Sequence, residues 1–336
     1  MDVTEPSSVV WELLRGAYRA AALGAVVDLD CAGHLKDGPL TVEELATRCG
    51  AHAPSLARLL RTCAASGLFT SVSPGTYALT DAGRLLVDGV PGSLRTAVQT
   101  NTTPTLSYGM HNLATTVRQG RSAFVEKYGV LYDHLGTDPE LNRIFNDFMT
   151  QRSQPMADGV AASYDFSSVK TLVDVGGGRG HILATALRAN PHLRGVLVEL
   201  AHVLPDARAA FDEWGLSERV ELVEGDFFAS VPAGHDAYLL GSVIHNWDDE
   251  DATRILRVVR EAMSDDGRVL LVEIVLPDDD SPHFGKDLDM RMLGLFGQGR
   301  ERSRSEHDAL LRAAGLRLVG AYDLPFHATL IEAVRV

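Results

Sequence analysis

The amino-acid sequence predicts an α/β protein in which an α-helical domain precedes a doubly wound parallel sheet. Up to about residue 160 the pattern is mainly helical, and beyond it short β-branched runs alternate with helical ones. Strands that alternate with helices imply crossover connections between parallel strands. The first of these strands leads into a glycine-rich turn at 174–180. At about 100–200 residues per domain, the 336 residues suggest two domains.

The N-terminal part has the order of a winged helix-turn-helix. Residues 9–30 are predicted to form a helix that is apolar around much of its circumference, so we expect it to be buried against another chain or domain. Thr41 and Glu44 have the spacing of a capping box at the start of the next helix. A second helix at 53–66 and two short strands on either side of Pro74–Gly75 complete the motif.

This motif often binds DNA, but the charges argue against that role here. The second helix carries Arg58 and Arg61 and little else that could read a groove, and the formal net charge is −14, from 45 acidic and 31 basic residues. We therefore expect no nucleic-acid partner. The predicted division is a winged-helix dimerisation domain at 1–90, a helical linker at 91–158 that contributes to a substrate pocket, and the sheet domain at 159–336.

Three cysteines, Cys31, Cys49 and Cys63, are an odd number without CxxC spacing. This argues against a disulfide framework and a zinc site and favours buried thiols in a reducing compartment. The N-terminus lacks the basic start and apolar run of a signal peptide, and no apolar stretch approaches the ~18–20 residues of a membrane span. We expect a cytoplasmic protein without a membrane partner.

The sheet domain presents several side chains where its strands end. Strands are expected at 170–175, 195–199, 220–224, 237–242 and 269–275, with the first crossover helix at 182–190. Ligands of such sheets bind beyond the carboxyl ends of the strands. Gly176 and Gly178 would let the backbone approach a ligand closely. Glu199, 199 − 176 = 23 residues beyond Gly176, could accept hydrogen bonds from both ribose hydroxyls, although a solvated acid at a strand end is the alternative.

The third strand is followed by Gly225-Asp226-Phe227. Asp226 could accept a hydrogen bond from the exocyclic amine of adenine, and Phe227 could stack on its ring. The sequence has no P-loop or basic cradle for a phosphate. These residues favour an adenosyl ligand without phosphates.

Four motifs together resemble class I S-adenosylmethionine methyltransferases and, more narrowly, the plant caffeate-type and actinobacterial antibiotic O-methyltransferases. They are DVGGGRG at 174–180, GDFF at 225–228, HNWDDE at 245–250 and GRERS at 299–303. The resemblance extends over essentially the whole chain, because that family also has an N-terminal winged-helix dimerisation domain. It implies a Rossmann-like C-terminal domain, a homodimer, and transfer of a methyl group from S-adenosylmethionine, with S-adenosylhomocysteine as product. The implied acceptor is a hydroxyl of a small aromatic metabolite (phenolic, naphthoate or polyketide-like).

The resemblance also implies a catalytic set. A single histidine is more often structural, but His245 matches the family's general base and follows the fourth strand. Glu273 and Glu301 match the two acids that flank this base and could orient its ring. Glu273 lies in an apolar run where a carboxylate needs a partner, whereas Glu301 could instead belong to a surface Arg-Glu-Arg cluster. The acids are dispersed along the sequence rather than clustered with ligand spacing, so no metal is expected.

The remaining matches concern binding. The cofactor set implied by the resemblance is Arg152, Ser153, Asp174, Gly176, Gly178, Glu199, Gly225, Asp226, Phe227 and Ser242. The implied acceptor wall is Met149, Asn246, Met292 and Phe296, although methionines at helical spacing also suit an ordinary core. Asn246 replaces the usual Asp, and Gly241 stands where plant members have a lysine near the adenine, with Ser242 expected to substitute in part.

Three alternatives remain open from the sequence. One is a winged-helix transcriptional regulator that senses a ligand in its α/β half. Another is a family member that keeps the cofactor but catalyses decarboxylation or hydroxylation. The third is a nitrogen acceptor. The sequence does not identify the acceptor or the position that is methylated.

Overall fold

The computed structural model describes residues 6–336, which form two compact units. Of the described residues, one unit comprises 6–108 and Leu135–Gln151, and the other comprises Gly109–His134 and Arg152–Val336. The first five residues of the predicted 1–90 domain lie outside the described residues. The division at residues 90 and 158 stays a prediction.

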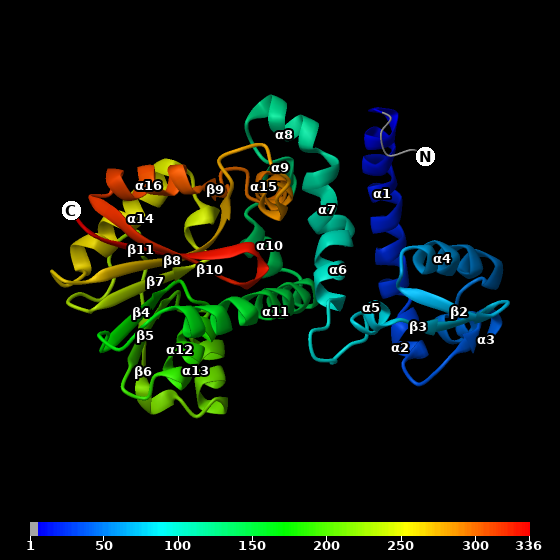
Figure 1. The fold of residues 1–336 in the computed structure, drawn as a ribbon, viewed down its shortest axis with the longest axis horizontal. Helices are drawn as coiled ribbons and strands as arrows, with labels where there is room; N and C mark the ends of the chain where they lie inside the picture. Colours follow the sequence, from blue (N-terminus) through cyan, green and yellow to red (C-terminus); the bar gives the residue numbers. More distant parts are fainter. Residues whose placement is uncertain (1–5) are drawn as a thin grey trace. The chain divides into compact units, whose positions relative to one another are not determined.

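The first unit contains the predicted winged helix-turn-helix, which is confirmed (Figure 1). Its elements are α1 (Pro6–Asp28), α2 (Cys31–Leu35), β1 (Leu40–Thr41), α3 (Val42–Cys49), α4 (Ala53–Ala65), β2 (Phe69–Ser73), β3 (Thr76–Leu79), α5 (Asp81–Arg84) and α6 (Arg95–Thr102). The three strands form an antiparallel sheet in the order β1-β3-β2. The capping box at the start of α3 is also confirmed, because the Thr41 hydroxyl accepts from the Glu44 N–H and the Glu44 carboxylate accepts from the Thr41 N–H at 2.8 Å.

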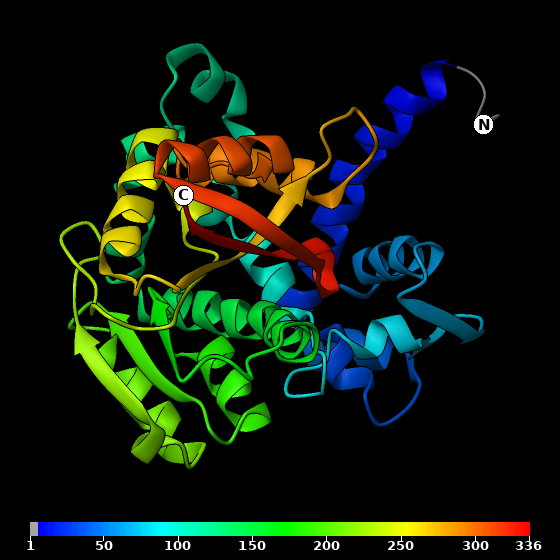
Figure 2. The same cartoon turned by 60° about the vertical axis from the view of Figure 1, so that its left-hand side comes forward.

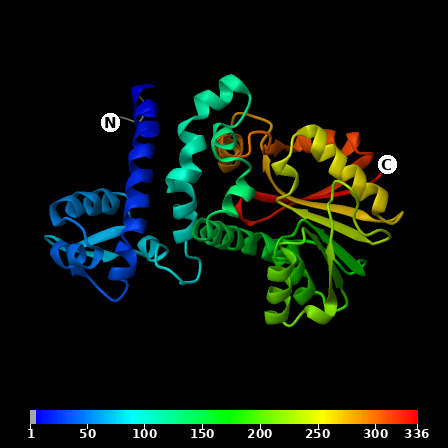
Figure 3. The same cartoon turned by 180° about the vertical axis from the view of Figure 1, so that it is seen from behind.

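Helix α1, which runs upright in Figure 3, has two dissimilar halves. Near its C-terminus Val26 and Val27 are 1% exposed and join the core of the first unit. Gly24 allows close packing on α6, because a Cβ there would lie 2.8 Å from Thr102. The N-terminal half exposes large apolar side chains, namely Val9, Val10, Trp11, Leu13, Leu14 and Tyr18.

Two of the three cysteines are buried as expected. Cys31 and Cys63 lie in the core, whereas Cys49 is only half-buried, with its sulfur 4.0 Å from that of Cys31. The prediction that Cys49 is buried was therefore wrong, because this residue ends α3 at the surface of the unit. Burial raises the pKa of Cys63 to about 11, so its thiol is uncharged at neutral pH.

The second unit is built on a mixed sheet with the order β10-β11-β8-β7-β4-β5-β6. The five predicted strands are present and parallel: β4 (Thr171–Val175), β5 (Arg194–Glu199), β6 (Val220–Glu224), β7 (Ala237–Gly241) and β8 (Arg268–Leu276). Two further strands extend the sheet beyond β8: β11 (Ala328–Arg335) pairs antiparallel with β8, and β10 (Leu316–Asp323) pairs antiparallel with β11. The short β9 (Arg302–Ser303) pairs with the end of β8.

Helices cover both faces of this sheet, which makes the fold a three-layer sandwich (Figures 1 and 2). On one side lie α14 (Asp249–Ala262) and α16 (Arg304–Ala313), and on the other α12 (His181–Ala189) and α13 (Leu204–Glu213). Alternate strand residues serve the two cores: Leu172 packs with α12 and α13, and Val173 with α14 and α16. Among residues 6–336, no helix is both long and apolar enough to cross a membrane.

The remaining helices are α7 (Pro104–His111), α8 (Leu113–Gln119), α9 (Ala123–Tyr128), α10 (Leu131–Leu135), α11 (Pro139–Ser163) and α15 (Phe284–Leu295). Within the second unit, α8 and α9 pack on α15. The Ser122 hydroxyl donates to the Gly294 carbonyl at 2.6 Å, which ties the start of α9 to the last turn of α15. These contacts fix the helix that carries the predicted acceptor residues Met292 and, at its C-cap, Phe296.

Candidate active site

Three predicted residues meet below the carboxyl edge of the sheet. His245 lies in the single turn Ile244–Asn246 that follows β7, and it is 5% exposed. Its Nδ1 lies 2.9 Å from Glu301 Oε1 and 3.6 Å from Glu273 Oε2. Both acids are 2% exposed. Glu301 is thus buried beside the imidazole, and it is not a member of a solvated surface cluster.

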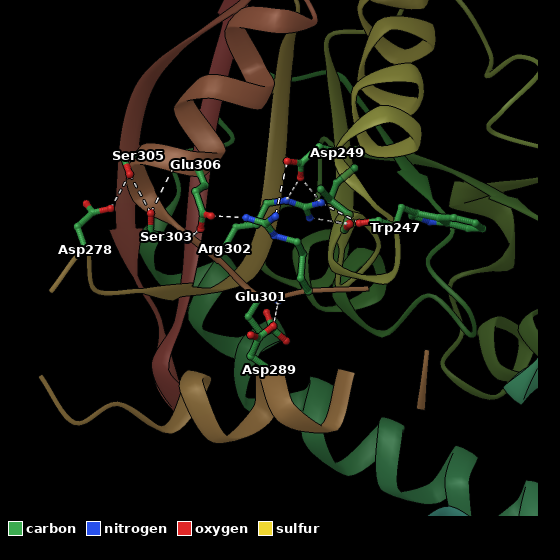
Figure 4. A network of polar contacts seen from close by, with 11 residues as sticks. Trp247, Asp249, Asp278, Asp289, Glu301, Arg302, Ser303, Ser305 and Glu306 are labelled. Atoms are coloured by element: carbon green, nitrogen blue, oxygen red, sulfur yellow. Dashed lines mark hydrogen bonds and ion pairs between the residues drawn. The ribbon is translucent and has the colours of Figure 1, made fainter. Parts of the chain in front are cut away.

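Hydrogen bonds that involve backbone N–H groups hold both acids in place. Glu273 lies inside β8 and does not end it, and its Oε1 accepts from the Ile244 N–H at 2.9 Å. The Glu301 N–H donates to Asp289 Oδ1 on α15 at 2.8 Å, and Figure 4 shows these two residues facing one another. The imidazole and its carboxylates are therefore anchored to three separate elements.

The surroundings of His245 favour its protonated form. Burial by itself would lower the pKa of His245, but the carboxylates of Glu273 and Glu301 outweigh burial and raise it above its ordinary value. The positive charge of Arg152 on α11 instead lowers the pKa of His245. Burial also raises the pKa of Glu273, so this carboxyl holds a proton more readily than a solvated one. The cluster is suited to accept a proton and keep it.

The expectation of dispersed acids was wrong for this cluster. His245, Glu273 and Glu301 offer potential ligand atoms that all lie within 4.8 Å of one another, a set that could hold a metal ion. The chain separates them by 28 and 56 residues, so their proximity arises only in the folded sheet. That the reaction needs no metal stays a prediction.

The glycine loop between β4 and α12 has the shape expected of a ligand cradle. Gly176 and Gly178 have φ values of +69° and +61°, which side chains other than glycine rarely adopt. The space beside Gly178 is open, because a Cβ there would meet no atom within 4 Å. The Gly178 N–H donates to Glu199 Oε1 at 2.9 Å, and the Leu200 N–H to Oε2 at 2.8 Å. The Glu199 carboxylate is therefore oriented by the loop.

Asp174 is buried behind this loop with unsatisfied polar atoms. The residue is 1% exposed, and neither carboxylate oxygen has a hydrogen-bond partner among residues 6–336. Burial and, secondarily, the charge of Glu199 raise its pKa to about 7. A buried carboxylate without donors indicates that a donor group from a ligand belongs nearby.

The residues after β6 lie beside the same loop. A Cβ on Gly176 would sit 3.3 Å from the Phe227 ring, which places this ring against the loop. The Gly225 N–H donates to the Glu199 carbonyl at 3.1 Å, which ties the ends of β6 and β5 together. Asp226 is exposed, and its carboxylate accepts from the Phe228 N–H at 2.9 Å.

The two departures from the family pattern have structural reasons. A Cβ on Gly241 would lie 2.6 Å from the Cδ1 atom of Ile182, so a lysine there requires the end of the Ile182 side chain to move. Ser242 adopts φ = +55°, and its carbonyl accepts from the Asn246 amide at 3.2 Å. An ionised Asp at 246 could not donate that hydrogen bond. The predicted role of Asn246 in acceptor binding therefore competes with a role inside the turn.

The structure places only part of the predicted acceptor wall together. A Cβ on Gly299 would lie 3.1 Å from the Cε atom of Met292 and 2.8 Å from the His245 carbonyl, so Met292 lies close to the backbone of His245. The Phe296 ring lies 6.0 Å from that of Tyr132. Arg152 and Ser153 belong to the second unit, whereas Met149 belongs to the first. The role of Met149 stays a prediction.

Sequence reasoning did not single out four residues around this site: Tyr132, Asp289, Arg291 and Arg302. Burial and the field of Arg152 lower the pKa of Arg291 to about 10. Asp289 and Arg291 lie on α15, which also carries Lys286 and Asp287, so their charge alone did not distinguish them in the sequence. Arg302 belongs to the GRERS motif at 299–303, in which the family resemblance implies a role only for Glu301.

Comparison with known proteins identifies the family. An O-methyltransferase domain matches residues 110–317, and an O-methyltransferase dimerisation domain matches residues 11–89. The chain belongs to the O-methyltransferase family. Phenazine O-methyltransferase PhzM of Lysobacter antibioticus is 37% identical over 331 residues, which cover 97% of this chain and 96% of that protein.

Two further relatives bear on the chemistry of this methyltransferase. The crystal structure of the O-methyltransferase NcsB1 from neocarzinostatin biosynthesis, in complex with S-adenosylmethionine and 2-hydroxy-5-methyl naphthoic acid, superposes with a TM-score of 0.82 at 36% identity, covering 94% of this chain and 96% of that one. Aclacinomycin 10-hydroxylase RdmB of Streptomyces purpurascens is 37% identical over 95% of this chain and 87% of that protein. This protein is an S-adenosylmethionine-dependent O-methyltransferase, and the regulator alternative is not favoured.

Proposed function

We propose that this enzyme methylates a hydroxyl of a small aromatic metabolite (a phenol, naphthoate or polyketide-like compound), with His245 as general base. One observation carries this proposal. The buried imidazole of His245 has its Nδ1 held 2.9 Å from Glu301, a carboxylate that is itself buried. Such an arrangement leaves Nε2 as the nitrogen that accepts a proton.

The chain's own residues explain how the proton is handled. With Nδ1–H donating to Glu301, the lone pair of Nε2 takes the proton of the acceptor hydroxyl, and the oxygen becomes a better nucleophile. The imidazolium that forms is stabilised by Glu273 and Glu301, the acids that raise the pKa of His245. Glu301 makes the closer contact and orients the ring, while Glu273 also holds the turn through Ile244.

The residues at the carboxyl ends of β4, β5 and β6, which we call the cofactor edge, fit an adenosyl ligand that carries an amino acid group. Bound S-adenosylmethionine supplies a methyl group on a sulfonium, and the product is S-adenosylhomocysteine. Glu199 and the glycine loop would hold the ribose, and Asp226 and Phe227 the adenine. The buried Asp174, which has no donor among the described residues, suits a charged or donor group of the ligand. Arg152 and Ser153 would face its carboxylate.

The acceptor side is proposed from Met292, Phe296, Asn246 and Met149. The relatives' names include a phenazine and a naphthoic acid, which supports a flat aromatic acceptor. The relative named as a hydroxylase is equally similar in sequence, so product analysis has to separate the two chemistries. Secondary metabolism in the cytoplasm is the proposed setting.

The proposed assembly is a homodimer. The dimerisation domain matches 11–89, and within this range α1 exposes Trp11, Leu13, Leu14 and Tyr18 by 46–76%. Contiguous exposed apolar side chains mark interaction sites. Leu13→Asp with Leu14→Asp should give monomers by light scattering, whereas Val72→Asp on the wing strand β2, 52% exposed, is the matched control and should remain dimeric. A dimeric double variant would contradict this interface.

The deciding experiment is an acceptor panel with methyl-labelled S-adenosylmethionine. We expect label on the oxygen of phenols, naphthoates or polyketides, with a mass gain of one methylene and release of S-adenosylhomocysteine. Calorimetry should show S-adenosylhomocysteine binding and no NAD binding. Label on nitrogen, or a product that gains one oxygen without label, would favour the alternatives instead.

A further inference from the structure

Arg302 is a fully buried arginine beside the proposed base. It lies in β9, is 1% exposed, and follows Glu301 directly in the chain. Charged residues are rarely buried unless several partners satisfy them. Figure 4 shows its guanidinium between Asp249 and the backbone at Trp247, with Glu301 at the other end of the same short segment.

The guanidinium makes four hydrogen bonds. Its Nε and Nη2 donate to Asp249 Oδ1 at 3.0 and 2.9 Å. Its Nη1 donates to the Ile244 carbonyl at 3.1 Å, and Nη2 also donates to the Trp247 carbonyl at 2.7 Å. The planar fork of an arginine can serve these acceptors together, which a lysine cannot do.

The two carbonyls stand on either side of His245. Ile244 precedes it, Trp247 ends the same turn, and the Arg300 N–H donates to the carbonyl of His245 itself at 2.8 Å. The segment 300–302 thus holds the turn 244–247 by hydrogen bonds. Its middle residue, Glu301, supplies the carboxylate that lies beside Nδ1 of His245. The side chain of Arg302 and the backbone N–H of Arg300 therefore link two segments that lie about 56 residues apart in the chain.

We propose that Arg302 is a positioning residue, which clamps the turn of His245 to β9 and so sets the hydrogen bond between His245 and Glu301. The role of His245 as base comes from the proposed function, and the clamp rests on it. Without Arg302 the turn keeps its bonds to Glu273 and Arg300. The Trp247 carbonyl loses its Arg302 donor, and the Ile244 carbonyl keeps only the Trp247 N–H of the turn itself. We expect the imidazole to become misaligned while the fold persists.

The direction of the His245 pKa separates positioning from a simple charge effect. The titratable and charged groups around His245 are Glu273 on β8, Glu301 before β9, Arg152 on α11 and the neutral His307 on α16. Removing the positive charge of Arg302 would by itself raise the pKa of His245. Loosening the bond to Glu301 would lower it, because that carboxylate is one of the groups that raise it. A fall therefore indicates lost positioning.

The test compares Arg302→Met with Arg335→Met. Arg335 in β11 likewise donates to backbone carbonyls, of Arg260 and Met263 at 2.6 and 2.5 Å, but serves the far end of the sheet. We expect Arg302→Met to lower kcat about 10–100-fold, the size expected for a misplaced catalytic group, with an unchanged KM for S-adenosylmethionine. The pKa of His245, followed by NMR on 15N-histidine-labelled protein and assigned with His245→Gln, should fall. Arg335→Met should lower Tm and leave kcat and this pKa unchanged.

Each outcome is decisive. Folded Arg302→Met protein with a wild-type His245 pKa and pH profile would overturn the clamp, as would a raised pKa. If Arg302→Met does not fold, Asp249→Asn weakens the same clamp from a 58% exposed side chain, and it should shift the pKa downward by a smaller amount. An unshifted pKa in that variant also overturns the proposal. The NMR titration does not depend on turnover, so the clamp is tested even if His245→Ala shows that another group is the base.

Discussion

The second unit contains two buried histidines whose surroundings have opposite effects. His245 is 5% exposed and His307, on α16, is 2% exposed. His245 has a carboxylate at 2.9 Å, and its pKa is raised. Neither nitrogen of His307 has a hydrogen-bond partner among residues 6–336, and burial together with the charge of Arg302 lowers its pKa to about 4.

The contrast shows what makes an imidazole a base. Burial disfavours the imidazolium in both places, because a charge loses its hydration. Only at His245 do two acids outweigh that loss. His307 stays neutral over the range in which enzymes of this class would work, so it is a structural residue despite its proximity to Glu301.

The largest expected effect is that of His245→Ala. If His245 is the base, kcat should fall by about 10²–10⁴-fold, the usual range for a positioned proton acceptor. Affinity for S-adenosylhomocysteine should barely change, because its contacts are assigned to the residues that follow β4, β5 and β6, whereas His245 follows β7. The defect should shrink as pH rises, since free phenols ionise near pH 10 without help. Near-normal turnover in well-folded variant protein, checked by a thermal melt, would mean that His245 resembles His307 in being structural.

Glu199→Gln tests whether the cofactor edge works independently of the histidines. The variant keeps the shape of Glu199 but removes the charge that receives the Gly178 N–H. Hydrogen bonds to charged groups contribute about 1.5–3 kcal/mol, so the Kd for S-adenosylhomocysteine should rise roughly 10–100-fold. The pH profile of kcat at saturating cofactor should stay as in the wild type. A shifted profile would show that the two halves of the site are coupled.

Glu301→Gln should lower the pKa of His245 and so make this residue more like His307, because the variant removes one of the two neighbouring carboxylates. In the wild type, the raised pKa of His245 means that the unprotonated base forms only above the ordinary value of about 6.5, so kcat should rise with pH through a midpoint above it. Removing one carboxylate should move this midpoint to lower pH and reduce the plateau by about tenfold, at the weak end of the range for acid–base catalysis. Glu273→Gln should act in the same direction but more mildly, because its contact is 3.6 Å. A midpoint that stays in place in both variants would contradict the assigned pair.

His307→Phe should change stability and leave catalysis unaltered. It removes two buried nitrogens that lack partners, at a site where each unsatisfied group costs about 1–3 kcal/mol, so we expect a gain of about 1 kcal/mol after the larger ring is accommodated. The folded-state pKa of about 4 lies below the unfolded value of 6.5, so the unfolded chain binds the proton first as pH falls. Stability is therefore complete above pH 6.5 and decreases by roughly 3 kcal/mol on acidification to pH 4.

Urea unfolding at several pH values measures both effects. The slope of stability against pH between 6.5 and 4 should be shallower in His307→Phe than in the wild type. His192, a half-buried histidine whose ring lies 3.1 Å from the Phe166 carbonyl, offers a matched control, because His192→Phe removes a satisfied imidazole. A stabilised control with an unaltered His307→Phe would contradict the account of His307.

The local features of this fold could be predicted from the sequence because each depends on neighbouring residues. The capping box of Thr41 and Glu44, the strand ending at Glu199 and the glycine turn after Val175 are short-range patterns, and the structure contains all three. The antiparallel β10 and β11 escaped prediction. They pair with one another as a hairpin, but only β11 pairs with β8, more than 50 residues earlier in the chain, so no nearby residue indicates which sheet edge the hairpin joins.

The amino-acid sequence by itself determined the family motifs, the winged helix, the parallel strands and the identity of His245. Tertiary structure alone decided which groups surround that histidine. Glu301 became a buried partner, Asn246 a donor inside the turn and Arg302 a clamp, because crossovers and β9 bring these segments to one sheet edge. A pKa depends on distance in space and on lost hydration, and neither can be read from spacing along the chain. For that reason His245 and His307 differ so much while both look like single histidines in the sequence.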